Sequence, residues 1–505
     1  MNALTSEKTV GMSVRTLLLP FGINAPDVSV QALILDSREV VIHSAFLAVK
    51  GHDRDGRDFI PQAISLGAHV IIADADEHSQ HGHVEMRDHS VIVHFYELSK
   101  SLSALADSFF NSPSSKMNTV AVTGTNGKTS TTQLVQQIAE LDNKIAASVG
   151  TLGASCQGVQ TETINTTPDA ISMQKLMYGF AEQGAELVAL EASSHALVQG
   201  RLDAINTNVA IFTNLTRDHL DYHGTLEEYA RAKRLLLQKP GLEWVVVNQE
   251  DAEHLNWLRS LYSHQKAVVV GLDKPTQEGV RFCIAKDIRY LDKGVSFTLE
   301  SSWGSTPLEC QLLGEFNVLN LLCAIASHLC LGMSIDKVST IVPLLRGIPG
   351  RMETLKDSEN IHLVIDYAHT PDALENALST LRLHHKKQLW CVFGCGGERD
   401  QGKRPLMGSI AERLADQVVL TNDNSRSEDP QSIVRDILAG CQEPEHICVE
   451  LDRKKAIRYA RKHANANDVV LVAGKGHEDY QLVDNKRLDY NERHFIRQLV
   501  EEIAQ

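Results

Sequence analysis

The stretch from 118 to 140 constrains the fold of this chain more than any other part of the sequence. The segment N-T-V-A-V at 118–122 predicts a strand, and a helical pattern runs from about 129 to 140. Between them lies the glycine-rich turn T-G-T-N-G-K-T-S at 123–130. A strand, a tight glycine turn and a helix in this order are typical of an α/β domain with a parallel sheet. In such a turn the backbone N–H groups and the helix N-terminus are arranged to bind phosphate.

The turn reads G-x-x-G-K-T, which is shorter than the usual G-x-x-x-x-G-K-[ST] loop because Val122 stands where that pattern has its first glycine. Lys128 would place a positive charge on the outer phosphates, and the Thr129 hydroxyl can ligate Mg²⁺. The alternative is an ordinary strand–helix turn with a lysine at the helix start. The shortened loop favours a divergent ATPase over a standard GTPase or kinase. The predicted nucleotide-binding residues are Gly124, Thr125, Asn126, Gly127, Lys128, Thr129 and Ser130.

The rest of the chain alternates strand-like and helix-like segments, so the expected fold class is α/β. Its 505 residues are enough for about two to four domains, and we expect three, at 1–100, 101–346 and 347–505. Alternation over 281–312 indicates an antiparallel excursion, followed by a long helix at 317–331. The histidine-rich stretch 78–90 lacks regular ligand spacing, which favours a polar loop over a metal site. Strands are expected at 33–35, 46–49, 70–73, 118–122, 186–190, 207–212, 244–248, 267–270, 361–365, 388–393, 417–420 and 468–472.

Composition narrows the class of partner. Lys plus Arg number 49 against 64 Asp plus Glu, a net charge of −15, which argues against a general nucleic-acid binder. No run approaches the roughly 18 apolar residues of a membrane span. The nine cysteines show no C-x-x-C pairing, as expected for free thiols in a reducing compartment. We expect a cytoplasmic protein that binds small molecules, with no nucleic-acid partner and no membrane insertion.

Candidate metal-binding groups follow the predicted strands. Glu191 ends the buried pattern 187–190, where a strand beside the phosphate loop could supply a metal contact; a capping or solvated glutamate is the alternative. His219 could also bind a metal, although a lone histidine is more often an ordinary loop or core residue. A capping box at 225–228 predicts a helix to about 238. Lys233 on that helix is, taken alone, typical of a surface lysine.

Seven motifs spread over most of the chain occur together in one order. They are T-G-T-N-G-K-T at 123–129, E-A-S-S-H at 191–195, T-N-L-T-R-D-H-L-D-Y-H-G at 213–224, A-R-A-K at 230–233, G-E-F-N-V-L-N at 314–320, P-G-R-M-E at 349–353 and D-Y-A-H-T-P-D at 366–372. In this set the chain resembles the Mur ligase family. L-D-S-R at 35–38 and N-T-T-P at 165–168 make it similar to the member that adds the third residue of the peptidoglycan stem peptide.

The resemblance implies three domains: an N-terminal uridine-nucleotide-binding domain, a central P-loop ATPase domain and a Rossmann-like C-terminal domain. It implies catalytic roles for Lys128, Lys233, His219 and Glu191. Thr129, Glu191 and His219 would serve Mg²⁺, and Lys233 would be carboxylated by CO₂ to a carbamate ligand. Asn317, Arg351 and Asp366 would contact ATP. The uridine diphosphate end would lie on Leu35, Ser37, His52, Asp53 and Arg54, and the muramoyl-dipeptide on Asn165, Thr166, Thr167, Ser193, Gln199 and Arg201.

The loop T-N-D-N-S-R-S-E at 421–428 bears on the amino acid that is added. Relatives that add meso-diaminopimelate carry D-N-P-R here, and lysine-adding relatives generally lack the arginine. A guanidinium matches the distal carboxylate that diaminopimelate has and lysine lacks. Ser425 replaces the proline, which we expect to loosen the turn and to affect affinity more than identity. The residues implied for the acceptor are Arg399, Asp423, Asn424, Ser425, Arg426, Gly474 and Glu478.

The implied reaction transfers the γ-phosphoryl group of ATP to the D-glutamate carboxylate of UDP-N-acetylmuramoyl-L-alanyl-D-glutamate. The amine of meso-diaminopimelate then attacks the acyl phosphate, a step of peptidoglycan precursor synthesis, and we expect the enzyme to be a monomer. Folylpolyglutamate synthase shares the ATPase core and is the alternative within the ligases. A P-loop protein that uses ATP only as a switch is the alternative outside them, and a catalytically inactive homologue is the third. Amine-independent ATP turnover would favour the switch.

Overall fold

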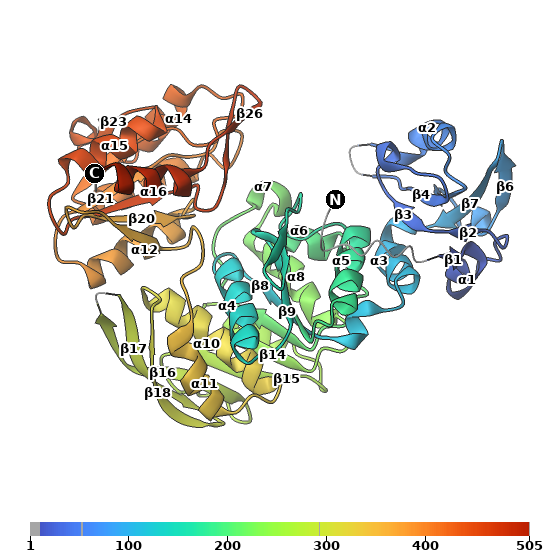
Figure 1. Ribbon diagram of the computed structural model, residues 1–505, viewed down its shortest axis with the longest axis horizontal. Coiled ribbons are helices and arrows are strands. Elements are labelled where there is room, and N and C mark those ends of the chain that lie inside the picture. Colours follow the sequence, from blue (N-terminus) through green and yellow to red (C-terminus); the bar gives the residue numbers. More distant parts are fainter. Residues whose placement is uncertain (1–10, 52–53, 292, 504–505) are drawn as a thin grey trace.

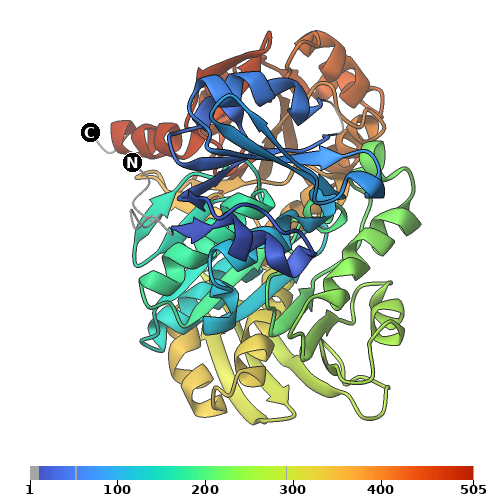
Figure 2. The ribbon, with the colours of Figure 1, turned by 90° about the vertical axis from the view of Figure 1, so that its right-hand side faces the viewer.

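The computed structural model describes residues 11–51, 54–291 and 293–503. Its three α/β bodies follow the chain: an N-terminal body at one end of the long axis, a central body, and a C-terminal body at the other end (Figure 1). Turned by 90°, the molecule shows its N-terminal body in front of the other two (Figure 2). Within the described ranges, no helix has the length and apolar character needed to cross a membrane.

The N-terminal body is a five-stranded sheet in the order β3-β4-β5-β7-β6, parallel except for the edge strand β6. Its strands and helices are β1 (Met12–Ser13), α1 (Val14–Leu18), β2 (Ser29–Val30), β3 (Ala32–Ile34), β4 (Ser44–Ala48), α2 (Ile60–Ser65), β5 (Val70–Ala75), β6 (Val84–Arg87), β7 (Ser90–Tyr96) and α3 (Leu98–Phe109). Strands β4 and β5 are buried along their whole length, as expected of strands covered on both faces. Helix α3 contacts α5 of the central body and so connects the two.

The central body is built on an eleven-stranded sheet in the order β11-β10-β9-β12-β8-β13-β14-β15-β16-β17-β18. The run from β9 to β16 is parallel, and antiparallel strands extend both ends. Its strands are β8 (Asn118–Thr123), β9 (Ala146–Gly150), β10 (Gly153–Cys156), β11 (Val159–Thr161), β12 (Leu187–Glu191), β13 (Val209–Phe212), β14 (Trp244–Asn248), β15 (Lys266–Gly271), β16 (Arg281–Leu291), β17 (Gly294–Ser301) and β18 (Gly304–Cys310).

Helices cover both faces of the central sheet and create two hydrophobic cores. One core joins α4, α10 and α11 to one face, and the other joins α5 and α8 to the opposite face. The alternation of the β8 side chains explains this: Val120 and Val122 belong to the first core and Ala121 to the second. The helices are α4 (Lys128–Leu141), α5 (Ala170–Glu182), α6 (Ser194–Val198), α7 (Leu220–His223), α8 (Leu226–Arg234), α9 (His254–Arg259), α10 (Glu315–Cys330) and α11 (Ile335–Ile341).

The C-terminal body has a six-stranded sheet in the order β19-β20-β24-β21-β22-β23, in which only β19 is antiparallel to its neighbour. Helices α12 to α14 cover one face, and α15 and α16 cover the other. Its elements are β19 (Glu353–Lys356), β20 (His362–Asp366), α12 (Pro371–His384), β21 (Leu389–Phe393), α13 (Lys403–Leu414), β22 (Gln417–Leu420), α14 (Pro430–Leu438), β23 (Cys448–Val449), α15 (Arg453–His463), β24 (Val469–Ala473), β25 (Tyr480–Val483), β26 (Lys486–Asp489) and α16 (Glu492–Ile503).

All twelve predicted strands are present, with bounds that differ by at most two residues, and the antiparallel excursion is β16 to β18. The long helix begins at Glu315 and ends at Cys330. One prediction was wrong: the polar loop expected at 78–90 contains the edge strand β6, where charged and apolar residues alternate. His81 has a structural role there, because its ring accepts from the Tyr96 N–H at 3.1 Å and contacts the Phe21 carbonyl at 3.0 Å.

Candidate active site

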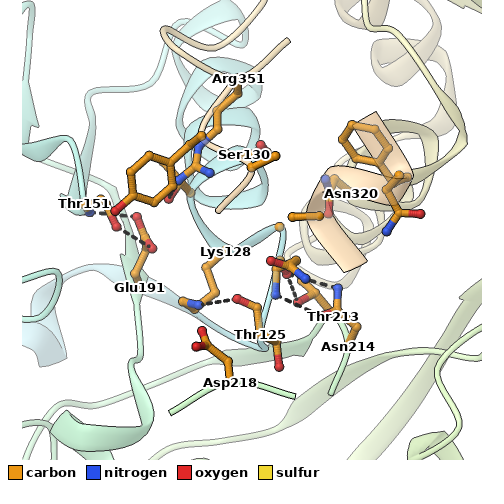
Figure 3. A pocket seen from close by; sticks show the side chains of 18 of the residues that line it. Thr125, Lys128, Ser130, Thr151, Glu191, Thr213, Asn214, Asp218, Asn320 and Arg351 are labelled. Atoms are coloured by element: carbon orange, nitrogen blue, oxygen red, sulfur yellow. Dashed lines mark hydrogen bonds between the residues drawn. The ribbon is translucent and has the colours of Figure 1, made fainter. Parts of the chain in front are cut away.

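A pocket of about 270 Å³ opens at the carboxyl ends of β8, β12 and β13. Its floor is the phosphate loop, and its opposite wall comes from the C-terminal body (Figure 3). Two hydrogen-bonded contacts hold the bodies together at its edge. Asn126 donates to Asp372 at 2.8 Å, and Arg351 donates to the Thr129 hydroxyl at 3.1 Å. Parallel sheets bind ligands at this edge, so the pocket lies where the fold predicts.

The two loop glycines have backbone conformations and neighbours that exclude a side chain. Gly127 has φ +83°, and a Cβ there would collide with the Asn320 amide; at Gly124 it would collide with the Thr213 hydroxyl. The Lys128 amine turns back to donate to the carbonyls of Gly124 at 2.9 Å and Thr125 at 2.8 Å. The loop therefore forms a tight cradle before any ligand is bound.

Glu191 is buried, with 1% of its surface exposed. Its carboxylate accepts from the Thr151 N–H at 2.8 Å and from the Thr151 hydroxyl at 3.1 Å. Gly150 leaves the room for it, because a Cβ at that position would collide with the carboxylate. Because its acceptor oxygens lie on the pocket wall, Glu191 suits a hard cation.

Lys233 is not a surface residue: only 1% of it is exposed. Its amine donates to the Gly124 carbonyl at 2.8 Å and lies 4.2 Å from the centre of the Tyr229 ring. Burial and the nearby Lys128 charge hold the pKa of Lys233 well below its usual value. Burial likewise lowers the pKa of Lys128. Neither amine forms an ion pair with a described residue, so the pocket has two amines and no carboxylate bonded to them, an arrangement that suits anionic ligands.

Asp218 and a group of histidines form the side of the pocket beyond Lys128. Figure 3 shows the Lys128 amine close to the Asp218 carboxylate. Burial opposes ionisation of Asp218, but the charges of His219, His369 and Lys128 outweigh it and lower the pKa of this carboxyl. His219 immediately precedes α7 with φ +52°, and its ring centre lies 5.0 Å from that of His195. Among the described residues no three His, Cys, Asp or Glu side chains converge as a preformed metal cage.

Of the three residues expected to contact ATP from the domain junctions, two line the pocket and one does not. The Arg351 guanidinium stacks 4.4 Å from the Tyr367 ring centre and lines the pocket. Asp366 accepts from the N–H groups of Met352 and Ala368, each at 2.8 Å, and also lines it. Asn317 does not belong to the lining, because its amide bonds the Leu313 carbonyl one turn back at 2.9 Å. Asn320, one turn farther along α10, lines the pocket instead.

The residues expected to hold the muramoyl-dipeptide form a connected group. The Thr167 hydroxyl donates to the Glu191 carbonyl at 2.6 Å and accepts from the Ser193 N–H at 3.1 Å. Arg201 donates to the Thr167 carbonyl at 2.6 Å and to the Gln199 amide oxygen. Thr166 and Ser193 line the pocket, and Asn165 precedes them on the same loop.

The uridine-binding residues expected from the sequence are in the N-terminal body. The Ser37 hydroxyl donates to Gln62 at 2.9 Å, Leu35 is partly buried and Arg54 is exposed. His52 and Asp53 lie outside the described residues. None of the described three lines the pocket at the phosphate loop.

The acceptor residues expected from the sequence gather on two loops at the carboxyl ends of β21 and β22. Arg426 has φ +54°, and its Nη1 donates to the carbonyls of Gly397 at 2.8 Å and Asn424 at 3.3 Å. Its Nε and Nη2 make no hydrogen bond to a described residue, which leaves that side of the guanidinium for a ligand. Arg399 is exposed on the neighbouring loop. Ser425 is 1% exposed and its hydroxyl has no hydrogen-bond partner among the described residues.

The other residues expected to bind the acceptor, Gly474 and Glu478, follow β24 and contact the loop that carries Arg426. Asn424 donates to Glu478 at 3.0 Å, and Lys475 donates to both of them. Asp423 is buried, and Lys475 and Arg453 overcome the effect of burial and lower its pKa. Gly474 has φ +115°, and a Cβ there would approach the Asp423 carboxylate to 2.6 Å.

Several lining residues were missed from the sequence: Asn214, Asp218, Asn320, His369 and Asn376. Asp218 and His369 belong to the motifs T-R-D-H and D-Y-A-H described above, so their membership in these motifs could have identified them as site residues. Asn320 follows Asn317 by three residues on one helix face, and only packing distinguishes the two. Lys475 stands in the motif that supplied Gly474 and Glu478.

Comparison with known proteins covers nearly the whole chain. Residues 29–110 match the Mur ligase family catalytic domain, 122–328 the Mur ligase middle domain, and 350–476 the Mur ligase glutamate ligase domain. A protein of Vibrio vulnificus (strain YJ016) named UDP-N-acetylmuramoyl-L-alanyl-D-glutamate–2,6-diaminopimelate ligase is 43% identical over 492 residues, which are 97% of this chain and 98% of that protein.

Two solved structures share the fold. A UDP-N-acetylmuramoyl-L-alanyl-D-glutamate–2,6-diaminopimelate ligase, 34% identical, has a TM-score of 0.69 and covers 98% of this chain and 100% of its own. A folylpolyglutamate synthase of Mycobacterium tuberculosis, 17% identical, has a TM-score of 0.62 and covers 74% of this chain and 92% of its own. With domain matches in each of the three bodies and a 43% identical relative spanning 97% of its length, this chain belongs to the Mur ligase family.

Proposed function

We propose that this protein uses ATP to join meso-diaminopimelate to the D-glutamate of UDP-N-acetylmuramoyl-L-alanyl-D-glutamate, in the synthesis of peptidoglycan precursors. Domains at 1–100, 101–346 and 347–505 would bind the uridine nucleotide, ATP and the incoming amino acid respectively. The relative whose name carries this reaction shares 43% of its residues with the chain. The folylpolyglutamate synthase alternative is disfavoured because its structure leaves about a quarter of this chain unmatched, at 74% coverage.

The observation that carries the proposal is the pair of buried lysines at the phosphate loop, of which Lys128 would meet the phosphates and Lys233 would serve the metal ion as a carbamate. Amide formation from a carboxylate needs activation, and bringing a carboxylate beside a triphosphate places two anions together. Lys128 makes no ion pair with the described residues, so its charge, together with bound Mg²⁺, can offset that repulsion. Holding the reactants in line is worth up to about 7–11 kcal/mol. The geometry therefore favours phosphoryl transfer to an acid over a simple nucleotide switch.

The site also suits Mg²⁺. The oxygen donors of Thr129 and Glu191 lie on the pocket wall with His219 beside them, and oxygen ligands are those Mg²⁺ prefers. When bound, the ion would neutralise charge on the phosphate oxygens. Because its pKa is held well below the usual value, the Lys233 amine is unprotonated more readily than an exposed lysine, and only the neutral amine can react with CO₂. A carbamate at Lys233 would add two oxygens to this donor set.

The remaining residues of the pocket would bind and orient the substrates. Gly124 to Ser130, Arg351 and Asp366 would hold ATP. Asn317 would contribute indirectly, because it accepts from the Asn320 amide at 3.3 Å. Ser193, Thr166, Thr167 and Arg201, with Asn165 and Gln199, would place the D-glutamate carboxylate beside Glu191. The uridine end would lie in the N-terminal body on Leu35, Ser37 and Arg54. Arg399 and Arg426 would bind the carboxylates of the acceptor, and Glu478 would pair with its distal ammonium.

An omission assay tests this function. Purified protein with Mg-ATP, the uridine-linked dipeptide and meso-diaminopimelate should release ADP, and each omission should reduce ADP release to background. ADP release that continues without the amine would support the switch alternative, and none with all three present would support an inactive homologue. We also infer a cytoplasmic monomer without nucleic-acid partners, consistent with the net charge of −15; light scattering of the purified protein tests the monomer.

A further inference from the structure

Lys475 is a fully buried lysine at the carboxyl end of β24, beneath the loop that carries Arg426. Its amine donates to the Asn424 amide oxygen at 2.9 Å and to Glu478 Oε2 at 2.8 Å, and lies 3.8 Å from Asp423. A buried ammonium is costly unless it is paired, so its presence here calls for a reason.

The hydrogen bonds around Lys475 fix the direction of each neighbour. Asn424 Oδ1 accepts from Lys475 and from the Leu482 N–H at 2.9 Å, so its NH₂ must point the other way, toward Glu478 Oε2 at 3.0 Å. Glu478 Oε2 therefore receives two donors. Within the part of the chain that the structure describes, Glu478 Oε1 receives only the Tyr367 hydroxyl, at 3.4 Å. Oε2 therefore has two donors at ordinary hydrogen-bond distances, whereas Oε1 has a single long hydrogen bond and can accept a further donor.

We propose that Lys475 is a positioning residue that saturates one oxygen of Glu478 and presents the other to the distal ammonium of the acceptor. This inference rests on the proposed function, because it takes Glu478 as the group that receives that ammonium. Lys475 does not touch the substrate. It acts by holding Asn424 and Glu478 in one arrangement, so that a cation entering the site finds a single oriented acceptor.

A purely structural role for Lys475 predicts a different outcome. Arg453, which is 3% exposed, bonds the Ala473 carbonyl at 2.8 Å and pairs with Glu492, and so holds the same end of β24 without Lys475. Loss of Lys475 should therefore disturb the orientation of Glu478 more than the loop that carries Arg426. If the lysine served only the fold, every acceptor would be affected alike.

The test compares two acceptors on one preparation of full-length protein: meso-diaminopimelate, and L-2-aminopimelate, which keeps the distal carboxylate and lacks the distal amine. In the wild type, the KM for diaminopimelate should be at least about tenfold lower than the KM for L-2-aminopimelate. This difference corresponds to one charge-assisted hydrogen bond to the distal ammonium. Lys475→Met should bring the ratio of the two KM values close to one while the KM for ATP stays unchanged. Glu478→Gln should lower the ratio in the same way, and Lys462→Met, an exposed lysine on α15, should leave it unchanged.

The outcomes separate the possible failures. A Lys475→Met protein that loses activity equally with both acceptors, or retains the wild-type ratio, would overturn the positioning role. Because the ratio is taken within one preparation, partial unfolding cancels from it. If the wild type itself shows no diaminopimelate-dependent ADP release, the proposed function fails instead. Lys475→Arg, which keeps the charge, should recover part of the ratio.

Discussion

Replacing Arg426 by alanine tests how the acceptor's distal carboxylate is recognised. Arg426 has φ +54°, and alanine carries the same Cβ, so the change leaves the backbone cost of this conformation unaltered. Nη1 is already bonded to Gly397 and Asn424, whereas Nε and Nη2 have no partner among the described residues. A hydrogen bond to a charged group is worth about 1.5–3 kcal/mol. We therefore expect Arg426→Ala to raise the KM for meso-diaminopimelate roughly 10- to 150-fold.

The assay measures initial rates of ADP release with diaminopimelate and ATP varied separately. The KM for ATP should change less than about twofold, because the phosphate loop belongs to the central body. Arg413→Ala is the matched control: that arginine pairs with Glu375 at 2.7 Å on the surface, where such pairs contribute little. Urea unfolding shows whether the two lost carbonyl contacts affect stability. Equal increases in both KM values would refute the assignment of Arg426 to the acceptor.

Three further predictions concern catalysis and stability. Lys128→Met should lower kcat for ADP release by at least about 100-fold without changing the unfolding midpoint in urea, and a smaller loss would contradict its role on the phosphates. Arg404→Met should lower the free energy of unfolding by about 3 kcal/mol. The Arg404 side chain is fully buried, and its Nη1 and Nη2 donate to the two Glu428 carboxylate oxygens at 2.6 and 2.7 Å. Burial lowers the pKa of His328 to about 4. Between pH 6.5 and 4 the unfolded chain therefore binds a proton that the folded chain does not, and stability falls as pH falls, by about 1.4 kcal/mol per pH unit for this group. His328→Gln should reduce that slope, and an unchanged slope would contradict the burial argument.

Local sequence pattern was sufficient for the parallel strands, because each is a short apolar run that ends in a polar or glycine-rich turn. The strand 244–248 appears with the predicted bounds, and 388–393 begins one residue later, at Leu389. The same reasoning failed at β6, where Glu85 and Arg87 make half of the residues charged. An edge strand with one solvated face is difficult to distinguish from a loop when polar residues dominate it.

The candidate site depended on longer-range structure. Lys233 on α8 looks like a surface lysine, because the helix is strongly charged and only tertiary packing turns that position toward Gly124 and Tyr229. The family resemblance implied Asn317, whereas Asn320 on the same helix face lines the pocket, and spacing alone cannot tell which of the two meets it. The role expected for Lys233 came from the family resemblance, and the structure shows that its side chain is buried.

The loop of Arg426 is expected to select an acceptor that carries a carboxylate at its far end. The most direct measurement incubates the protein with Mg-ATP, the uridine-linked dipeptide and, in parallel, meso-diaminopimelate, L-lysine and L-glutamate, and identifies the product by mass. We predict one new product, the diaminopimelate adduct, with little or no lysine adduct. Lysine coupled at a comparable rate would contradict the claim.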